Sequence, residues 1–390
     1  MEGVDIDKVE LELENVTPLF IAGADQRNVE NEGLRTPSLR GLLRWWFRAI
    51  MGGVLFSSGH LSINEVKNKE EEVWGNTTAQ SKVLINVLTI TTRMGEVERK
   101  GGISYLSYGV FERKYIEGSF RIYIRFKQTL SEEDKKKVIA TLWMLLNLGN
   151  IGGKNRKGFG SLRVINDTSI YGLSFKNPIE ISKLKEYLES NIKKCLTFFG
   201  WKGSTISSET LPPFPVIAPN FWKMKLLNRI YPSEIKAIND IGEKIRQYRE
   251  DRGNPSAKHE QKIKKFSYWV TKDYNSVKSI YTKSSPSTPK GSIFGLPHQF
   301  QFQSINKKAM VKGMEHDRRA SPLYIKIWKL DSNKFAIGLQ LFKSIFLPEN
   351  KLEIIDLKDE NKKAKVDLPS YDYLEDFLNL NELSGEWIKI

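Results

Sequence analysis

The stretch at residues 34–53, LRTPSLRGLLRWWFRAIMGG, constrains the fold more than any other part of the chain. Its apolar side chains recur with the spacing of one face of an α-helix, and three arginines recur every four residues beside them. One face of such a helix must be covered by a core, while the other stays accessible. The apolar positions are Leu39, Leu42, Leu43, Trp46, Phe47 and Ile50, and the arginines are Arg40, Arg44 and Arg48.

The start of this helix favours an anion. Thr36 is the expected N-cap and Pro37 the first helical residue, so unpaired backbone N–H groups and the positive end of the helix dipole lie close to Arg35 and Arg40. Guanidinium groups beside a helix N-terminus suit a phosphate. The alternative is a solvated amphipathic helix whose arginines only maintain solubility.

Strand and helix patterns alternate over residues 5–168. We predict strands at 9–14, 82–93, 119–127 and 161–166, because apolar side chains alternate or β-branched residues cluster there. A second helix begins at Ser131, which forms a capping box with Asp134, and ends at Gly149. The resulting order, β-α-β-β-α-β, is the split ferredoxin-like arrangement and predicts an α+β domain over 1–168.

The second half, residues 169–390, is less regular. Helical periodicity occurs at 182–199, 233–249 and 371–380, and strands are expected at 216–227, 323–330 and 335–347. This pattern allows a second ferredoxin-like domain with rearrangements. Residues 253–292, rich in lysine, serine and proline, are predicted to be a basic, partly mobile insertion.

Charge is unevenly distributed along the chain. The 390 residues carry 61 Lys and Arg against 46 Asp and Glu, a net charge of +15, and residues 223–329 hold 23 of the basic and only 9 of the acidic side chains. Such a block favours a polyanion, either nucleic acid or an anionic membrane surface. A lysine-rich solubilising surface would have the same composition.

Cysteine and hydropathy patterns restrict the class of protein. Cys195 is the single cysteine and lies in an apolar run, which indicates a packed core thiol and excludes internal disulfides and thiolate metal sites. No segment has eighteen uninterrupted apolar residues, and the acidic start lacks the pattern of a secretory signal. We therefore expect a cytoplasmic protein with no membrane partner, no metal and no cofactor.

A glycine-rich segment at 149–160, GNIGGKNRKGFG, offers a second cationic site. It contains five glycines and three basic residues between a helix and a strand, so backbone N–H groups can approach an anion that the cations neutralise. It lacks the Lys-Ser/Thr of a Walker loop and the strand-to-helix context of a dinucleotide site. A flexible basic turn is the alternative. The expected binding residues are Gly152, Gly153, Lys154, Asn155, Arg156, Lys157 and Gly158.

The third predicted strand offers a further cationic surface, with Arg121, Tyr123 and Arg125 on its outer face. Aromatic residues near the three surfaces, Tyr123, Trp45 and Phe159, are candidates for stacking on bases. Three cationic surfaces in one domain fit repeated contact along a polynucleotide better than a single bound nucleotide. An ordinary solvated strand face remains the alternative for the third surface.

Catalysis has little support in the sequence. The four histidines, His60, His259, His298 and His316, are scattered and show no metal-ligand or nucleophile spacing. His60, soon after the first helix, is the one candidate general base near the basic surfaces. Glu315, His316 and Asp317 are expected to form a solvated charged loop.

Four motifs together resemble the RAMP superfamily, the repeat-associated mysterious proteins of CRISPR systems. They are TPSLRGLLRWWFRAIMGG, GNIGGKNRKGFGS, IFGLPH at 293–298 and RRASPLYIKIW at 318–328. More narrowly, they resemble the family of first subunits of the Cmr complex, the type III-B RNA-guided effector. The double tryptophan after the leucine-arginine segment is the more specific feature.

The resemblance implies two ferredoxin-like domains and a non-catalytic subunit that contacts guide CRISPR RNA, single-stranded target RNA or both, beside other Cmr subunits. It assigns RNA binding to Arg40, Arg44, Trp45 and Arg48 and to the glycine-rich segment. Arg318 and Arg319 match the second-domain motif and either touch RNA or brace the domain interface. The chain departs from a symmetrical pattern because no second glycine-rich segment closes it.

Three functions remain open at this point. We expect an RNA-binding structural subunit that is not an enzyme. The first alternative is a metal-independent endoribonuclease of the same superfamily that processes CRISPR RNA precursors with a base such as His60. The second is a general nucleic-acid chaperone, which would bind DNA and RNA equally.

Overall fold

The computed structural model describes residues 7–21, 23, 33–110, 112–203, 210–250, 272–282 and 284–390. The chain divides into two compact units. The larger unit comprises Met1–Asp240, Tyr324–Ser344 and Ser384–Ile390, and the smaller unit comprises Ile241–Leu323 and Ile345–Leu383. The domain boundary at residue 168 that the sequence predicts is a different division from these two compact units, and it stays a prediction.

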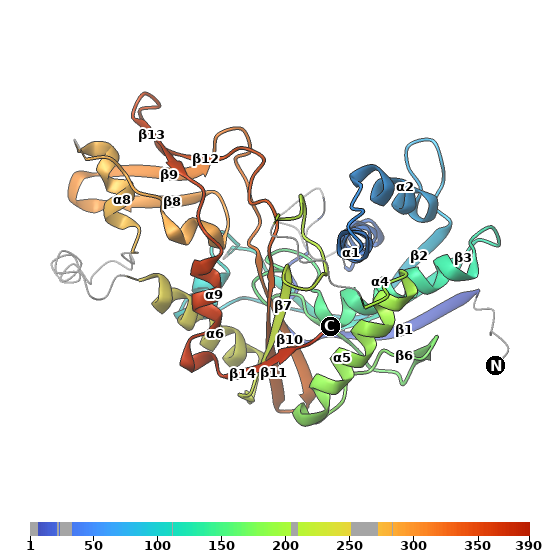
Figure 1. The fold of residues 1–390 in the computed structure, drawn as a ribbon. Coiled ribbons are helices and arrows are strands. Elements are labelled where there is room, and N and C mark those ends of the chain that lie inside the picture. The colour runs from blue at the N-terminus through green and yellow to red at the C-terminus, as the bar shows by residue number, and fades with distance from the viewer. Residues whose placement is uncertain are drawn as a thin grey trace. The chain divides into compact units, whose positions relative to one another are not determined.

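The first sheet of the larger unit contains the predicted strands. Its order is β2-β3-β1-β4, and each neighbouring pair is antiparallel (Figure 1). The predicted succession of two helices and four strands is confirmed, with two short helices added. In chain order the elements are β1 (Lys8–Asn15), α1 (Thr36–Ser57), α2 (Ile63–Trp74), β2 (Val83–Gly95), α3 (Gly101–Leu106), β3 (Tyr115–Phe126), α4 (Glu132–Leu148) and β4 (Leu162–Val164).

The second sheet of the larger unit has the order β10-β11-β7-β14. Between the two sheets in sequence lie the pair of short strands β5 (Ser169–Ile170) and β6 (Leu173–Ser174) and the helix α5 (Ile181–Phe198), which the 182–199 periodicity predicted. The strands of the second sheet are β7 (Trp222–Leu227), β10 (Leu323–Asp331), β11 (Lys334–Phe342) and β14 (Gly385–Ile388).

The smaller unit contains a third sheet of order β13-β12-β9-β8, which the sequence did not predict. Helix α6 (Glu234–Arg249) includes residues of both units. The first part of the predicted insertion, up to residue 271, lies outside the described residues; its later part includes α8. The remaining elements are α8 (Tyr274–Lys278), β8 (His298–Phe302), β9 (Lys307–Gly313), β12 (Lys351–Asp356), β13 (Lys363–Asp367) and α9 (Asp372–Leu378).

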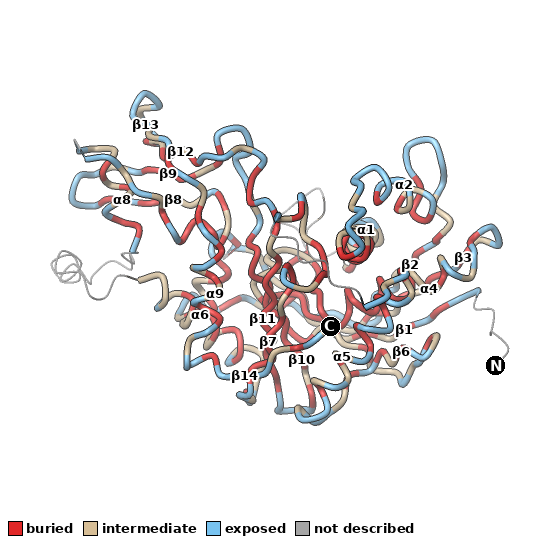
Figure 2. The backbone as a smooth tube through the Cα atoms, viewed as in Figure 1, coloured by how far each residue is buried: buried red, intermediate tan, exposed pale blue. Residues whose placement is uncertain are grey.

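One continuous hydrophobic core joins the two sheets of the larger unit. Helix α4 is buried on all sides from Val138 to Leu148, and β10 and β11 are buried along most of their length (Figure 2). A helix that is apolar all round belongs in a core, so α4 positions whatever follows its C-terminus. The glycine-rich segment follows it directly.

The structure confirms an α+β fold with several antiparallel sheets. Cys195 is buried, as expected, and burial raises the pKa of its thiol. Across the described ranges, none of the helices is both long enough and apolar enough to cross a bilayer.

Candidate nucleic-acid interface

Helix α1 has the two faces that its sequence indicated. Leu39, Leu43, Trp46, Phe47 and Ile50 are buried in the core, while Leu42 is partly buried against it. The expected cap is shifted by one residue, because Arg35 occupies the N-cap position and Thr36 is the first helical residue. The Arg35 side chain makes no capping hydrogen bond, and no acidic residue lies in the first turn. The first turn of α1 itself therefore offers no carboxylate to compensate the positive end of the helix dipole.

The arginine row of α1 is largely paired within the protein. Glu70 of α2 is buried, and its carboxylate accepts hydrogen bonds from Arg44 Nε and from Arg48 Nη1, the latter at 2.8 and 3.0 Å. Arg40 is half-buried, and its Nε is buried without a hydrogen-bond acceptor among the described residues. The sequence analysis missed Glu70, and with it the counter-charge for two of the predicted phosphate ligands.

The glycine-rich segment, residues 149–160, has a defined backbone. Gly149 forms the C-cap of α4, as predicted, and its N–H donates to Leu145 O at 2.9 Å. Gly160 has φ +74°, and a Cβ there would lie 1.8 Å from the carbonyl oxygen of Ile151. Gly153 N–H donates to Phe20 O at 2.7 Å. These hydrogen bonds tie the segment to α4 on one side and to Phe20 on the other.

Lys154 lies in the segment with a positive φ of 58°. Burial, and then the nearby Arg113, lower the pKa of its ammonium group. Two cations close together at a partly buried position favour a bound anion, because the anion offsets their mutual repulsion and stabilises the charged amine against the cost of burial. Arg113 is a further residue that the sequence analysis missed.

Arg156 brings the segment and α1 together. Its guanidinium lies over the Trp45 ring at 5.6 Å from the centroid, a cation–π contact between two of the predicted sites. Trp45 is half-buried and also packs edge-on against Trp46 and Phe342. The expectation that Phe159 stacks on bases is wrong, because its side chain is fully buried and packs on Phe20.

A buried amide holds the segment closed. Asn150 is 1% exposed; its Nδ2 donates to Asn155 O at 2.5 Å and to Ile325 O at 2.7 Å, and its Oδ1 accepts from Ser161 Oγ at 2.6 Å. Its backbone N–H donates to the Tyr324 hydroxyl at 3.0 Å. A buried amide with its donors and acceptors satisfied fixes the backbone around it.

Strand β10 supplies most of the remaining support. Lys326 is fully buried, and its Nζ donates to Leu146 O and Gly149 O at 2.8 Å each and to Leu162 O at 3.3 Å. It thus satisfies carbonyl groups at the C-terminus of α4, while burial lowers its pKa to about 7. Ile325 N–H donates to Arg156 O at 3.1 Å, and Trp328 Nε1 donates to Asn147 O at 2.9 Å.

The RRASPLYIKIW motif therefore has an observable role. Its residues from Tyr324 to Trp328 contact residues 147–161 one after another, more than 160 positions away in sequence. The glycine-rich segment rests on this strand. The sequence analysis found both motifs but had no signal that would pair them.

The other residues of that motif lie in the smaller unit. Arg319 Nη2 donates to Ile345 O at 3.2 Å, and its guanidinium lies over the Phe346 ring. Its backbone also pairs with Leu296 of the IFGLPH motif. Arg318 is exposed. Of the two roles left open for these residues, Arg319 is engaged inside its own unit, and Arg318 is accessible to a ligand.

The outer face of β3 is less cationic than its sequence suggested. Arg121 forms ion pairs with Glu12 at 2.5 Å and Glu10 at 3.3 Å on the adjacent strand β1. Arg125 on the same face is exposed. Glu10 and Glu12 of β1 therefore neutralise Arg121, one of the two arginines on this face.

The histidines do not assemble a catalytic group among the described residues. His60 is exposed. His298 Nδ1 lies 3.1 Å from Arg249 Nη2. Exposed His316 contacts the Glu349 carboxylate at 2.8 Å; although burial raises the pKa of Glu349, hydrogen bonds from backbone N–H groups and from the His316 side chain lower it to about 2. His259 lies outside the described residues.

Residues 12–163 match the model of the RAMP superfamily. The chain is 25% identical over 352 residues to the CRISPR system Cmr subunit Cmr1-1 of Pyrococcus furiosus, covering 87% of this chain and 89% of that protein. It is 29% identical over 180 residues to Cmr subunit Cmr1-2 of the same organism, covering 39% of this chain and 92% of that protein.

Solved structures have the same fold. The crystal structure of apo Cmr1 from Pyrococcus furiosus matches with a TM-score of 0.58 at 19% identity and covers 98% of both chains. A chain of the cryo-EM structure of type III-B Cmr-beta bound to cognate target RNA matches with a TM-score of 0.50 at 16% identity, covering 87% of this chain and 96% of that chain. The resemblance predicted from the sequence motifs is confirmed.

Proposed function

This chain carries a RAMP superfamily domain at residues 12–163 and resembles the Cmr1 subunits over most of its length, and from that premise we propose that it is an RNA-binding subunit of a type III-B Cmr effector complex. Its ligands are guide CRISPR RNA, single-stranded target RNA or both, and its protein partners are the other Cmr subunits. A cytoplasmic location is part of the same proposal.

One observation carries the RNA-binding proposal. The glycine-rich segment and α1 meet at Arg156 and Trp45, and the same segment holds Lys154, whose pKa is lowered by burial and by Arg113. A phosphate backbone carries the negative charge that lysine and arginine side chains bind, and the half-exposed Trp45 offers an aromatic ring next to Arg156. The buried supports of the segment keep this geometry fixed before RNA arrives, which lowers the entropic cost of binding.

We also infer two ferredoxin-like domains. The first consists of β1, α1, β2, β3, α4 and β4 with strand order β2-β3-β1-β4. The second uses β7, α6, β10, β11, α9 and β14, and its strand order β10-β11-β7-β14 is the same permutation. The third sheet comes from the two segments inserted between α6 and β10 and between β11 and α9, which accounts for the irregular sequence pattern of this half.

A non-catalytic role is part of the proposal. The cationic surface contains lysine and arginine side chains suited to holding phosphate, and the exposed His60 has no hydrogen-bond partner for its ring among the described residues. The endoribonuclease remains the second candidate, and it predicts RNA fragments that disappear in His60→Ala.

The test is an anisotropy titration of labelled single-stranded RNA and the equivalent DNA with the full chain at two salt concentrations. The variant replaces Lys154, Arg156 and Lys157 by alanine. A matched control replaces three exposed lysines on and after α5, Lys183, Lys193 and Lys202. We expect the first variant to bind RNA at least tenfold more weakly, with a salt slope shallower by about two, since each phosphate contact contributes about 0.7.

The control variant is expected to match the wild type. Equal weakening in both variants would mean that net charge alone attracts RNA, and equal affinity for DNA and RNA would favour the chaperone. The RNA is recovered afterwards on a denaturing gel. Cleaved RNA would favour the endoribonuclease over the RNA-binding structural subunit.

A further inference from the structure

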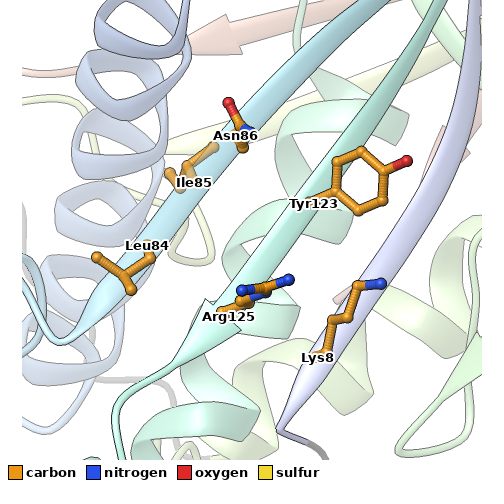
Figure 3. A pocket seen from close by; sticks show the side chains of 6 residues that line it. All are labelled: Lys8, Leu84, Ile85, Asn86, Tyr123 and Arg125. Carbon is orange, nitrogen blue, oxygen red and sulfur yellow. The ribbon is translucent and has the colours of Figure 1, made fainter.

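We propose that a pocket on the open face of the first sheet binds one unpaired RNA nucleotide, a contact separate in sequence from the glycine-rich segment. The pocket encloses ≈ 330 Å³, and its lining side chains come from three adjacent strands (Figure 3). Leu84 pairs in register with Arg125, Asn86 with Tyr123, and Lys8 with Arg125. The inference rests on the proposed RNA-binding function and extends it to a second surface. The lining residues are Lys8, Leu84, Ile85, Asn86, Tyr123 and Arg125.

Side chains on this face of the sheet are exposed in the part of the larger unit that the structure describes. The alternate residues Ile122 and Ile124 are buried in the core, whereas Leu84 and Leu88 on the edge strand β2 are 50% and 51% exposed. Two half-exposed leucines on one face of the edge strand, on either side of Asn86, are an unusual surface for a protein to leave in water. A ligand with an apolar face would cover them.

The charges around the pocket select an anionic ligand. The carboxylates of β1 are engaged, because Glu12 pairs with Arg121, and Glu10 lies 3.3 Å from Arg121 and 3.4 Å from Lys8. Arg125 is exposed and has no hydrogen bond or ion pair with any described residue. The lining contains no carboxylate. A phosphate is therefore attracted to Arg125, which can bind it through two N–H groups.

The remaining lining groups suit a nucleobase. Tyr123 is half-exposed and provides the aromatic ring, and the Asn86 amide beside it, exposed and without a hydrogen-bond partner among the described residues, offers a donor and an acceptor to a base edge. Lys8 Nζ lies 5.1 Å from the centroid of the Tyr123 ring. An exposed cation–π contact changes an equilibrium by about two- to fivefold, and stacking of a base by about 5- to 150-fold. A base therefore displaces Lys8.

A protein subunit is a weaker fit to the same face. The centre of a protein interface is depleted of charged side chains and lysine, whereas this pocket holds Lys8 and Arg125 around a single aromatic ring. An aromatic ring, an amide and a guanidinium within one small pocket match the base and the phosphate of one nucleotide.

The experiment titrates the full chain with a 12-nucleotide oligouridine and with an abasic ribose-phosphate analogue of the same length. The variants are Tyr123→Leu, Tyr123→Phe and Arg125→Ala, with Arg93→Ala as the control of equal charge on the same sheet, where Arg93 pairs with Glu117 outside the pocket. We expect Tyr123→Leu to weaken oligouridine binding about tenfold without weakening the abasic analogue, and Tyr123→Phe to keep the wild-type affinity.

Arg125→Ala is expected to weaken both oligonucleotides and to lower the salt slope by about 0.7, with Arg93→Ala unchanged. If the wild type binds oligouridine and Tyr123→Leu binds it within twofold of the wild type, the pocket does not bind a base and the inference is overturned while the proposed function stands. If the wild type binds no RNA, both are overturned. Release of the Leu84→Glu variant from the assembled effector complex, with RNA affinity unchanged, would assign this face to a protein subunit instead.

Discussion

The arginine row of α1 and the glycine-rich segment look alike in sequence, yet the protein treats their charges in opposite ways. Arg44 and Arg48 share the buried carboxylate of Glu70, whereas Lys154 has Arg113 as its charged neighbour and a lowered pKa. The carboxylate of Glu70 neutralises the first region, whereas in the second burial and a nearby cation lower the pKa of a lysine. The number of cations in a motif is therefore a poor guide to phosphate binding, because the carboxylate that a neighbouring element supplies decides the outcome.

The largest expected difference is in the effect on stability when a glycine of each region is replaced by alanine. Gly160→Ala places a Cβ against Ile151 O at a positive φ, and we expect it to destabilise the protein by about 3 kcal/mol and to abolish RNA binding. Gly41→Ala in α1 is the matched control, since its Cβ meets no atom within 4 Å and alanine favours a helix by about 1 kcal/mol. Thermal unfolding measures both; similar melting temperatures for the two variants would contradict the fixed geometry of the segment.

Lys326, which holds the glycine-rich segment, should make the free energy of unfolding of the protein depend on pH. Its pKa is about 7 in the folded protein and about 10.4 when unfolded, so between these values the unfolded chain binds one more proton. Stability from this group therefore rises with pH from about 7 to 10, by at most about 1.4 kcal/mol per pH unit. Lys326→Met should flatten this rise in melting curves at pH 7.5, 8.5 and 9.5. An unchanged slope would mean that the amine stays charged in its ring of carbonyl groups.

Removing the carboxylate of Glu70 should make the arginines of α1 available to bind phosphate. Glu70→Gln releases Arg44 and Arg48 from their ion pairs, and we expect RNA to bind about three- to tenfold more tightly at low salt. Glu72→Gln on the same helix, where the exposed carboxylate pairs only with Lys69 among the described residues, removes an equal charge as the control. RNA affinity is measured by anisotropy. If it rises equally in both variants, the effect comes from the net charge of the protein and not from the release of Arg44 and Arg48.

The smallest expected effect concerns Lys154. Its pKa is lowered in the free protein, and a bound phosphate favours the charged amine. RNA affinity should therefore be constant below that pKa and fall above it, where binding must take up a proton. We expect a decline of a few fold as the pH rises toward the ordinary lysine pKa of about 10.4, and no such decline in Lys154→Arg, whose guanidinium stays charged. Parallel pH profiles for the two proteins would exclude Lys154 from phosphate contact.

Local patterns predicted the first domain well. The apolar stripe of α1, the strand alternation of β1 and β3 and the C-cap at Gly149 depend on residues close in sequence, and the structure confirms them. Helix α2 was missed because INEVKNKEEEVW has only Val66, Val73 and Trp74 as apolar buried residues among many charges. The third sheet was missed for a similar reason, since short strands such as KKAMVKG alternate weakly and carry lysines.

The candidate site was predicted in part. The motifs singled out α1 and the glycine-rich segment as two separate surfaces, and the structure brings them together at Arg156 and Trp45. Phe159 was misjudged, because an aromatic residue among glycines has no periodicity that reveals its burial. Glu70, Asn150 and Lys326 act through contacts with distant elements. Such partners become visible only when the fold brings them together.

The contacts between β10 and residues 147–161 also set an order of events during synthesis. The segment leaves the ribosome more than 160 residues before Tyr324, Lys326 and Trp328 exist to hold it. Contacts over such a sequence separation form late, because a long loop must close first. A nascent chain that ends before residue 323 therefore lacks the strand on which the segment rests. The surface that we propose for RNA therefore matures only after residues 324–328 have been synthesised, which delays any engagement of RNA by the segment until then.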